Sequence, residues 1–498
     1  MRYTSPTTAM AHQVAARAAC DAKPPAPCAE DVFAYLMDMG TGKSKVILDE
    51  FGEGAISGGP LDLLVIGPAG SYRNWFEDKS AEQPSELNRH CDPEFRERLI
   101  DVPWQSGGGA AWRRSVDAML RCRDKKRPRA LFVNVEALSK RDKAYELVQE
   151  FLDQRGAFMC VDESTTIKGQ GAKRAQNVVQ LGQEALTKRI LSGLWTPRSP
   201  MDLFMQCSFL SPDVLGAKNY YTFRARYAQL IRQNFGGRKF MQIVGYQNLD
   251  ELQEKVARYS YRVLKKDCLD LAPKTYVTRD VDLTDEQKRM IKEIRAFGHA
   301  SIGDTGKFVT TDMVIKQIMR LHMINCGFVV DDEDRIVHEV PERRTEALME
   351  TLEQHSGKAI IWAPFRRSVD RIVSALAKEY GPESVAQFHG GNKSTRGAEE
   401  RRFLSSPACR FMVATQAAGM RGNTWTVADL TVYYANNYDL EQRDQSEDRN
   451  HRKGQRNPVT YVDLIARGTV DEKMVKSLRQ KIDMATMINN EEFREWLI

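Results

Sequence analysis

The chain has 498 residues, of which 42% are hydrophobic and 28% are charged, a composition that excludes wholesale disorder and fits two to four globular domains. Its net charge of +6 comes from 73 basic and 67 acidic residues, a mild excess that permits a nucleic-acid partner without indicating one. No stretch approaches 18 consecutive apolar residues, so we expect no membrane span.

The N-terminus and the cysteines favour a cytoplasmic location. Residues 1–6 lack the apolar core of a signal peptide. The nine cysteines are scattered and form no CxxC pair, so neither a zinc ribbon nor a redox motif is expected. Scattered cysteines of this kind are typical small core residues of a reducing compartment.

Short apolar runs alternate with longer helical patterns through the first part of the chain. The predicted strands are residues 63–66, 130–135, 158–161 and 189–191. Each run is nearly all apolar, as expected of strands that are buried on both faces of a parallel sheet. The alternation predicts an α/β domain at residues 1–210.

The alternation fades after this domain. Helices are predicted at 249–258 and 284–295, with a glycine-containing loop at 298–307, so we expect a mainly helical insertion and linker at 211–335.

Strands resume in the last third of the chain. They are predicted at 358–362, 411–414, 430–434 and 459–464. A second α/β domain is therefore expected at 336–498, and its closing stretch, 470–487, reads as one long helix.

A glycine-containing loop is the first candidate site. In Gly40-Thr41-Gly42-Lys43-Ser44, glycines would let backbone N–H groups close around phosphate oxygens, and a helix beginning here would point its positive end at the same anion. Lys43 would reach the β- and γ-phosphates, and the Ser44 hydroxyl would ligate Mg²⁺. The strict phosphate-loop pattern requires glycine where this chain has Met37, so the match is to a looser form.

An acidic pair follows the predicted strand at 158–161. Asp162 is positioned to hold Mg²⁺ and Glu163 to polarise the attacking water. Adjacent carboxylates repel unless a cation lies between them or one faces solvent. The alternative is an ordinary acidic pair at a strand end.

The third motif runs from Gln445 to Gln455 and contains two arginines. Arg449 and Arg452 are three residues apart and could project from one helical face toward a common target. The planar arginine fork bonds two phosphate oxygens and stays charged at any pH. The alternative is a charged surface helix.

These motifs, with Leu191-Ser192-Gly193 and Thr196-Pro197 between them, resemble the ordered motifs of the Swi/Snf-related ATPases of helicase superfamily two. The resemblance spans residues 10–485 and is to compact phage- or prophage-type members. It implies two RecA-like parallel-sheet lobes, a helical insertion and linker, and a C-terminal bracing helix. Leu194 and Trp195 depart from the family pattern, either replacing its Thr-Pro or inserted before Thr196-Pro197.

The same resemblance assigns the site residues, with ATP and Mg²⁺ as cofactors. The expected catalytic residues are Lys43, Glu163, Gln445, Arg449 and Arg452. The expected nucleotide-binding residues are Gln13, Gly40, Thr41, Gly42, Lys43 and Ser44. The expected metal ligands are Ser44 and Asp162, and the expected nucleic-acid contacts are Asn74, Trp75, Lys168, Thr415 and Arg421. A solvent-exposed helical glutamine explains Gln13 almost equally well, and His389 fits a structural role as well as a functional one.

The family favours a motor that hydrolyses ATP while it tracks on double-stranded DNA, without sustained strand separation. Two alternatives stay open: a strand-separating DNA or RNA helicase, and a nucleotide-gated module that binds nucleic acid or a partner. A replication, recombination or transcription protein stays open as a partner, and the expected setting is the cytoplasm of a bacterial or phage-infected cell.

Overall fold

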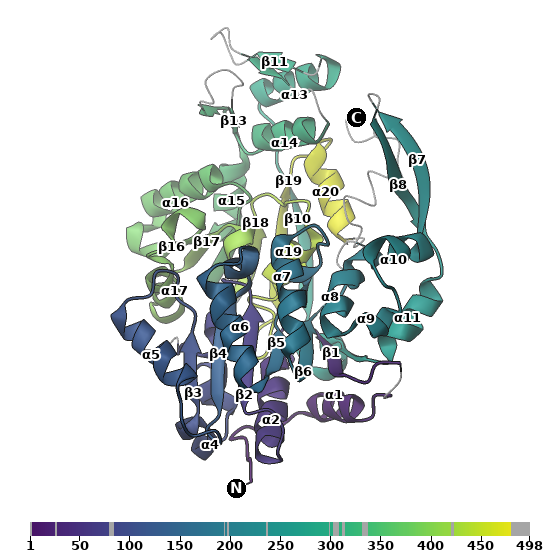
Figure 1. The fold of residues 1–498 in the computed structure, drawn as a ribbon. Helices are drawn as coiled ribbons and strands as arrows, with labels where there is room; N and C mark the ends of the chain where they lie inside the picture. The colour runs from purple at the N-terminus through teal and green to yellow at the C-terminus, as the bar shows by residue number, and fades with distance from the viewer. Residues whose placement is uncertain are drawn as a thin grey trace. The chain divides into compact units, whose positions relative to one another are not determined.

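The computed structural model describes residues 2–24, 27–78, 84–193, 195–196, 199–235, 238–297, 299–301, 308–310, 314–330, 337–419 and 423–479. The chain divides into two compact units, Met1–Asp270 and Leu271–Ile498. Each unit is built on a parallel sheet with helices on its faces (Figure 1), which confirms the predicted class of two α/β lobes. Among the described residues, no helix combines the length and the apolar character that crossing a membrane requires.

The first unit contains a seven-stranded sheet in which every neighbouring pair is parallel. Its strands, in spatial order, are β3 (Ile100–Pro103), β4 (Arg129–Asn134), β2 (Asp62–Gly67), β5 (Phe158–Val161), β6 (Thr187–Ser192), β1 (Asp31–Met37) and β9 (Ser260–Val263). The four strands predicted for this domain are confirmed as β2, β4, β5 and β6.

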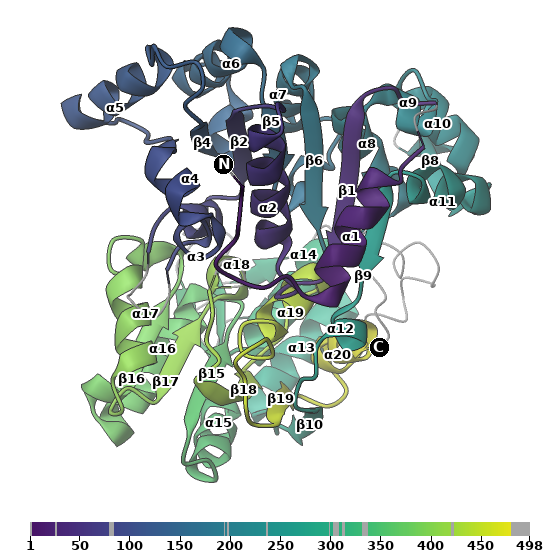
Figure 2. The same cartoon turned by 90° about the horizontal axis from the view of Figure 1, so that it is seen from below.

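Alternate residues of these strands enter two separate cores, one on each face of the sheet. Leu64 and Val133 belong to one core, and Val65 and Phe132 to the other. The first core is covered by α5 (Ala110–Leu120), α6 (Lys143–Arg155), α7 (Lys173–Leu181), α8 (Leu203–Leu210), α9 (Pro212–Leu215), α10 (Tyr220–Tyr227) and α11 (Leu249–Ala257). The second core is covered by α1 (Ala11–Asp21), α2 (Lys43–Ile56), α3 (Glu86–His90) and α4 (Pro93–Arg98) (Figure 2). Burial on both faces explains why the central strands are continuous apolar runs.

Two further elements complete this unit. The strands β7 (Ala228–Phe235) and β8 (Arg238–Tyr246) pair antiparallel as a separate two-stranded sheet. The short helix α12 (Lys265–Cys268) follows β9.

The second unit contains a six-stranded parallel sheet. Its strands, in spatial order, are β10 (Lys274–Asp280), β19 (Val459–Ile465), β18 (Ala428–Tyr433), β15 (Lys358–Trp362), β17 (Phe411–Ala414) and β16 (Val385–Phe388). Its helices are α13 (Asp285–Phe297), α14 (Val314–Asn325), α15 (Arg344–Glu353), α16 (Arg366–Tyr380), α17 (Arg396–Ser405), α18 (Gln416–Gly419), α19 (Leu440–Glu447) and α20 (Val470–Arg479). Two small antiparallel ladders join β11 (His299–Ser301) to β12 (Phe308–Thr310) and β13 (Phe328–Val330) to β14 (Val337–Glu339). All four predicted strands are present.

The segment predicted as a mainly helical linker, 211–335, is divided between the two units. The predicted helices are present as α11 and α13, but β9 closes one edge of the first sheet and β10 closes one edge of the second. The boundary at Asp270 and Leu271 therefore lies inside this segment, and both units extend beyond the predicted limits 1–210 and 336–498. Of the predicted loop at 298–307, residues 298 and 302–307 lie outside the described residues, as do residues 480–487 of the predicted C-terminal helix.

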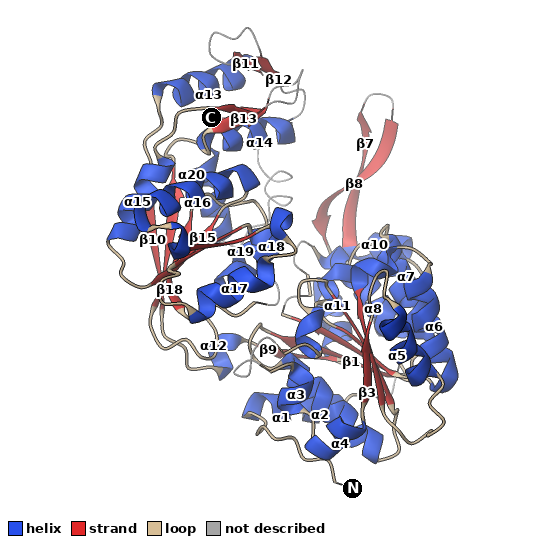
Figure 3. Ribbon diagram, turned by 90° about the vertical axis from the view of Figure 1, so that its left-hand side faces the viewer, coloured by secondary structure: helices blue, strands red, loops and turns tan. Residues whose placement is uncertain are grey.

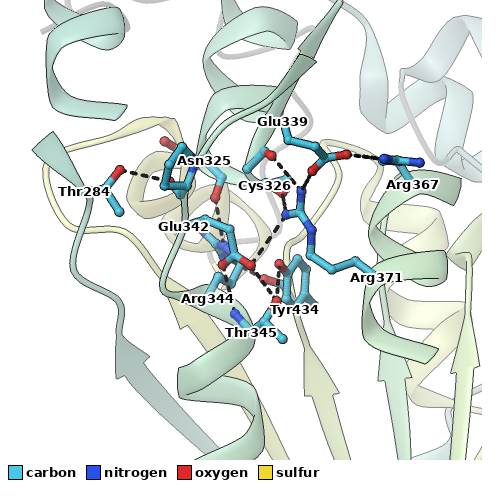
Figure 4. Close-up of polar contacts among 12 residues, drawn as sticks. Thr284, Asn325, Cys326, Glu339, Glu342, Arg344, Thr345, Arg367, Arg371 and Tyr434 are labelled. Atoms are coloured by element: carbon cyan, nitrogen blue, oxygen red, sulfur yellow. Dashed lines mark hydrogen bonds and ion pairs between the residues drawn. The ribbon is translucent and has the colours of Figure 1, made fainter. Parts of the chain in front are cut away.

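The buried guanidinium of Arg344 ties several parts of the second unit together (Figure 4). It donates to the backbone carbonyls of Asn325 (3.2 Å) and Tyr434 (2.6 Å), which Figure 4 labels. It also donates to the carbonyl of Leu464 (2.9 Å). It also pairs with Asp471 in the first turn of α20. A buried charge is tolerated when its donors are satisfied in this way, so Arg344 fastens α20 to the sheet.

Replacement of Arg344 by methionine should lower the free energy of unfolding of the second unit by about 3–5 kcal/mol, because it leaves the Asp471 carboxylate buried without its partner. Native-state hydrogen exchange of residues 459–479 measures the change. The exposed neighbour Arg343 provides the matched control, since Arg343→Met should shift stability by no more than about 0.5 kcal/mol. If hydrogen-exchange protection of residues 459–479 is unchanged in Arg344→Met, Arg344 does not fasten α20 to the sheet.

Candidate active site

The loop between β1 and α2 has the backbone geometry of a phosphate cradle. Gly40 and Gly42 have φ values of +82° and +86°, a region that L side chains rarely adopt. A Cβ on Gly42 would lie 2.1 Å from the side-chain nitrogen of Gln13. The Thr41 hydroxyl donates to the carbonyl of Asp38 at 2.7 Å, which closes the turn. The loop thus leads directly into the N-terminus of α2, where backbone N–H groups favour an anion.

Gln13 supports this loop from α1. Its side-chain nitrogen donates to the Thr41 carbonyl at 3.0 Å, and its side-chain oxygen accepts from the N–H of Met10 at 2.9 Å. Gln13 is 3% exposed, so the alternative of a solvent-exposed helical glutamine is wrong. The described contacts give it a role in holding the loop, and its contact with the nucleotide stays a prediction.

Lys43 connects the phosphate loop to the acidic pair. Its ammonium donates to the carbonyl of Met37 at 3.0 Å and lies 3.7 Å from a carboxylate oxygen of Glu163. The side chains of Lys43 and Glu163 are 10% and 11% exposed, so water screens this pair weakly. The adjacent Ser44 is partly exposed. The structure therefore brings together residues that are about 120 positions apart in the sequence.

Asp162 and Glu163 follow the end of β5 with an unusual backbone. Glu163 has a φ of +48°, and such a conformation costs a side-chain-bearing residue about 1–3 kcal/mol, a strain that concentrates at functional sites. The N–H of Glu163 donates to one oxygen of Asp162 at 3.0 Å, and the indole N–H of Trp75 donates to the other at 3.2 Å. Both oxygens of the Asp162 carboxylate are thus oriented.

This contact corrects the prediction for Trp75, which was expected to touch nucleic acid. The side chain is 1% exposed and packs near Phe132 in the core of the first unit. A side chain buried in this way offers no surface to nucleic acid, and we assign it to positioning Asp162. Asn74 and Lys168 are partly exposed, and their nucleic-acid contacts stay predictions.

Gln206, a fully buried residue of α8, is a functional residue that the sequence did not predict. Its side-chain oxygen accepts from the Ser164 hydroxyl at 2.6 Å, and its nitrogen donates to the carbonyls of Trp195 and Asp202, both at 2.8 Å. Gln206 thereby links the residue after the acidic pair to the segment around Trp195. A glutamine within a helix that is otherwise apolar except for Ser208 was the available signal.

The acidic pair fits a divalent cation. Burial and the neighbouring Glu163 raise the pKa of Asp162 to about 6, against the opposing influence of Lys43 and Trp75. A cation would relieve this repulsion. Among the described residues, no group of three or more His, Cys, Asp and Glu could hold a metal. A Mg²⁺ ion takes most of its ligands from water and phosphates, so it needs one or two ligands from the protein.

Asp162→Asn should change the pH dependence of stability. Because the folded-state pKa of about 6 lies above the ordinary aspartate value of 3.8, ionisation of Asp162 opposes folding. Relative to Asp162→Asn, the nucleotide-free wild type should therefore lose about 2–3 kcal/mol of unfolding free energy as the pH rises from 4 to 7.5. Denaturant unfolding of both proteins at several pH values measures this difference. A difference that does not vary with pH would contradict the raised pKa.

The arginine motif of the second unit is arranged differently from its prediction. The helix α19 ends at Glu447, so Arg449 and Arg452 lie in the turns that follow it instead of on one helical face. The two guanidinium groups share one acceptor, the carbonyl of Asn423, at 2.9 Å and 3.3 Å. The carbonyl of Asn423, and not a shared helical face, thus brings the two arginines together.

Burial separates the two arginines. Arg449 is 0% exposed and also donates to the carbonyl of Gln445 at 2.9 Å, whereas Arg452 is partly exposed. Gln445 is 8% exposed, and its side-chain nitrogen donates to Glu441 at 3.0 Å. His451 is also buried and bonds the carbonyl of Ala272 at 2.8 Å. The alternative of a charged surface helix is therefore wrong.

The remaining predicted residues of this unit have mixed outcomes. Thr415 follows β17, is partly exposed, and donates its N–H to the carbonyl of Phe388 at 3.1 Å. Its contact with nucleic acid stays a prediction, and Arg421 lies outside the described residues. His389 is 3% exposed and its ring accepts from the N–H of Gly391 at 3.1 Å, which supports its structural interpretation.

Comparison with known proteins identifies the family. The SNF2-related domain matches residues 32–338, which is more than half of the chain. The chain belongs to the SNF2-related family of helicase superfamily two. The helicase conserved C-terminal domain matches residues 343–454, so the chain carries both domains of the family's ATPase.

The relatives of this SNF2-related chain are distant in sequence. It is 22% identical to the CHD3-type chromatin-remodeling factor PICKLE of Arabidopsis thaliana, over 66% of this chain and 24% of that protein. It is 25% identical to the DNA annealing helicase and endonuclease ZRANB3 of Mus musculus, over 68% of this chain and 30% of that protein. The chain thus spans about a quarter of the length of these relatives. A solved structure, the Sulfolobus solfataricus SWI2/SNF2 ATPase core in complex with dsDNA, is 19% identical, with a TM-score of 0.40 and coverage of 100% and 97% of the two chains.

Proposed function

We propose that the chain is an ATP-dependent motor that hydrolyses ATP while it tracks on double-stranded DNA. The contacts of Lys43 carry this proposal, because they join a glycine-shaped anion cradle to a strained acidic pair inside one unit. Family membership supports ATP as the nucleotide. A glycine-shaped loop, a buried ammonium and a paired carboxylate are the groups that phosphoryl transfer requires.

In the proposed mechanism, the backbone of Gly40–Gly42 and the Lys43 ammonium bind the phosphates. Mg²⁺, held by Ser44 and Asp162, would neutralise phosphate charge when it is bound. Glu163 accepts a hydrogen bond from the attacking water and orients it, and Trp75 keeps the Asp162 carboxylate in place. Hydrolysis thereby becomes an in-line attack whose charges are met by groups already in position.

The second unit would contribute positive charge. We assign Arg452 to the γ-phosphate, where an arginine stabilises charge in the transition state, and Arg449 and Gln445 to positioning it. Hydrolysis that depends on such an arginine can be coupled to a conformational change.

The nucleic acid would be held chiefly through its backbone. Asn74, Lys168, Thr415 and Arg421 are the proposed contacts, and phosphate contacts make binding sensitive to salt and nearly independent of sequence. We favour duplex DNA as the track because two similar proteins are described as a chromatin-remodeling factor and as a DNA annealing helicase.

The test is an ATPase assay with no nucleic acid, single-stranded DNA, duplex DNA and RNA. We expect the largest stimulation with duplex DNA, followed by displacement of a triplex-forming strand at the cost of ATP. Stimulation by RNA alone would overturn the DNA motor. Stimulation by duplex DNA with strand separation would favour the helicase, and stimulation without displacement would favour the nucleotide-gated binding module.

A further inference from the structure

The hairpin β7–β8 is the part of the first unit that the proposed mechanism does not use. It forms a two-stranded sheet of its own after α10 and extends away from the seven-stranded sheet (Figure 3). The paired residues Leu230 and Ile243 pack against the core of this unit and anchor the base of the hairpin. The hairpin is thus fixed to the first unit at its base, while the rest of it projects from that unit.

The segment around the hairpin, residues 214–249, carries positive charge only. Residues 214–249 contain no aspartate or glutamate and six basic residues, Lys218, Arg224, Arg226, Arg232, Arg238 and Lys239. The remaining 67 of the 73 basic residues are balanced by the 67 acidic residues of the chain. The whole formal charge of +6 therefore corresponds to this one segment. Glu251, from the following helix, pairs with Arg226, while Arg232 is exposed on β7.

Apolar and aromatic side chains accompany this charge. Ile231 and Val244 are 50% and 43% exposed, and Tyr246 at the end of β8 is 37% exposed. Nearby on α10, Tyr221 is 66% exposed, and the Arg224 guanidinium lies 5.6 Å from the centre of its ring. Exposed rings and stacked arginines among an excess of positive charges are typical of surfaces that bind nucleic acid.

We propose that β7–β8 and the adjoining face of α10 bind duplex DNA as a second contact, separate from the motor motifs. A two-stranded antiparallel ribbon is one of the two elements that fit the major groove. The exposed Arg232 side chain on it would contact a backbone phosphate, so this contact strengthens binding without specifying sequence. An apolar protein partner would be a poorer match, because it would leave these charges without counterions. The inference rests on the proposed function in taking duplex DNA as the track.

The test uses the full chain and a fluorescently labelled duplex of about 30 base pairs, without nucleotide, at several salt concentrations. Charge reversal by Arg232→Glu should weaken binding about five- to tenfold and reduce the slope of log affinity against log salt by about 1. The double variant Arg224→Glu, Arg232→Glu should have a larger effect. The controls are Arg123→Glu and Lys125→Glu, which reverse exposed charges in another loop of the same unit and should bind like wild type.

A second measurement separates this inference from the proposed function. In the ATPase assay, Arg232→Glu should raise the DNA concentration needed for half-maximal stimulation and leave the rate without DNA unchanged. Wild-type affinity in the hairpin variants would overturn the inference and leave the motor intact. If these variants lose duplex binding, the hairpin contact is supported. If, in addition, DNA does not stimulate ATP hydrolysis by the wild type, the proposed DNA motor is overturned. Failure of the wild type to bind duplex would overturn both, and preference for poly-L-glutamate over duplex would reassign the hairpin to an acidic protein.

Discussion

Lys43→Ala should reduce ATP hydrolysis at least about 10²–10³-fold, the usual cost of removing a preorganised group that meets developing charge in a buried site. The ammonium is held between the Met37 carbonyl and Glu163, so it is already oriented before nucleotide arrives. Alanine would remove the positive charge that offsets the carboxylates of the acidic pair and the phosphates. Steady-state phosphate release, with and without duplex DNA, measures the effect.

Lys45 provides the matched control for this variant. It lies on the same helix and is similarly buried, at 3% exposure, but its ammonium pairs with Asp49 at 2.7 Å and donates to Ser5. Lys45→Ala should therefore lower thermal stability while the folded protein keeps its hydrolysis rate. Wild-type turnover in Lys43→Ala would refute the assignment of the phosphate loop. Equal loss of activity in the two variants would show that folding of α2 explains both.

Burial determined which parts of the fold were predictable from sequence. The eight predicted strands lie inside the two sheets, where both faces are covered and most strands are apolar runs. The missed strands include all four edge strands, β3, β9, β10 and β16. An edge strand has a neighbour on one side alone and keeps exposed residues, such as Tyr276 in β10 at 46% exposure. The interior strand β1 was also missed, because Val32 is its one β-branched residue and its apolar run fits a helix equally well.

The candidate site divides along a similar line. The types of residue that bind phosphate and metal follow from their chemistry, so Lys43 and the acidic pair were predictable. The sequence did not predict which neighbour orients each group, because these contacts join positions that are far apart in the chain. Trp75 and Asp162 are 87 residues apart, and Ser164 and Gln206 are 42 residues apart. Such partners are ordinary core residues until the fold is known.

The arginine motif shows the same limit within one residue type. In the sequence, Arg449 and Arg452 are equivalent candidates for the phosphate. In the structure, both donate to the Asn423 carbonyl, but Arg449 is completely buried and Arg452 is partly exposed. A fully buried guanidinium that bonds backbone carbonyls stabilises the turn around it, whereas an exposed one can reach a ligand. Burial therefore separates two roles that the motif combines.

Arg452→Ala should leave ATP binding within a few-fold of wild type and slow hydrolysis by about 10³-fold or more, because an arginine at the γ-phosphate stabilises the transition state more than the ground state. Arg449→Ala should instead lower thermal stability, since the carbonyls of Gln445 and Asn423 would lose a buried donor. Binding of a fluorescent ATP analogue, single-turnover hydrolysis and thermal midpoints measure the three quantities. Arg452→Lys keeps the charge without the planar fork, so it should recover part of the rate. If Arg452→Ala destabilised the protein as much as Arg449→Ala while hydrolysis by the folded fraction stayed normal, both arginines would be structural, and the charge at the γ-phosphate would have to come from another residue.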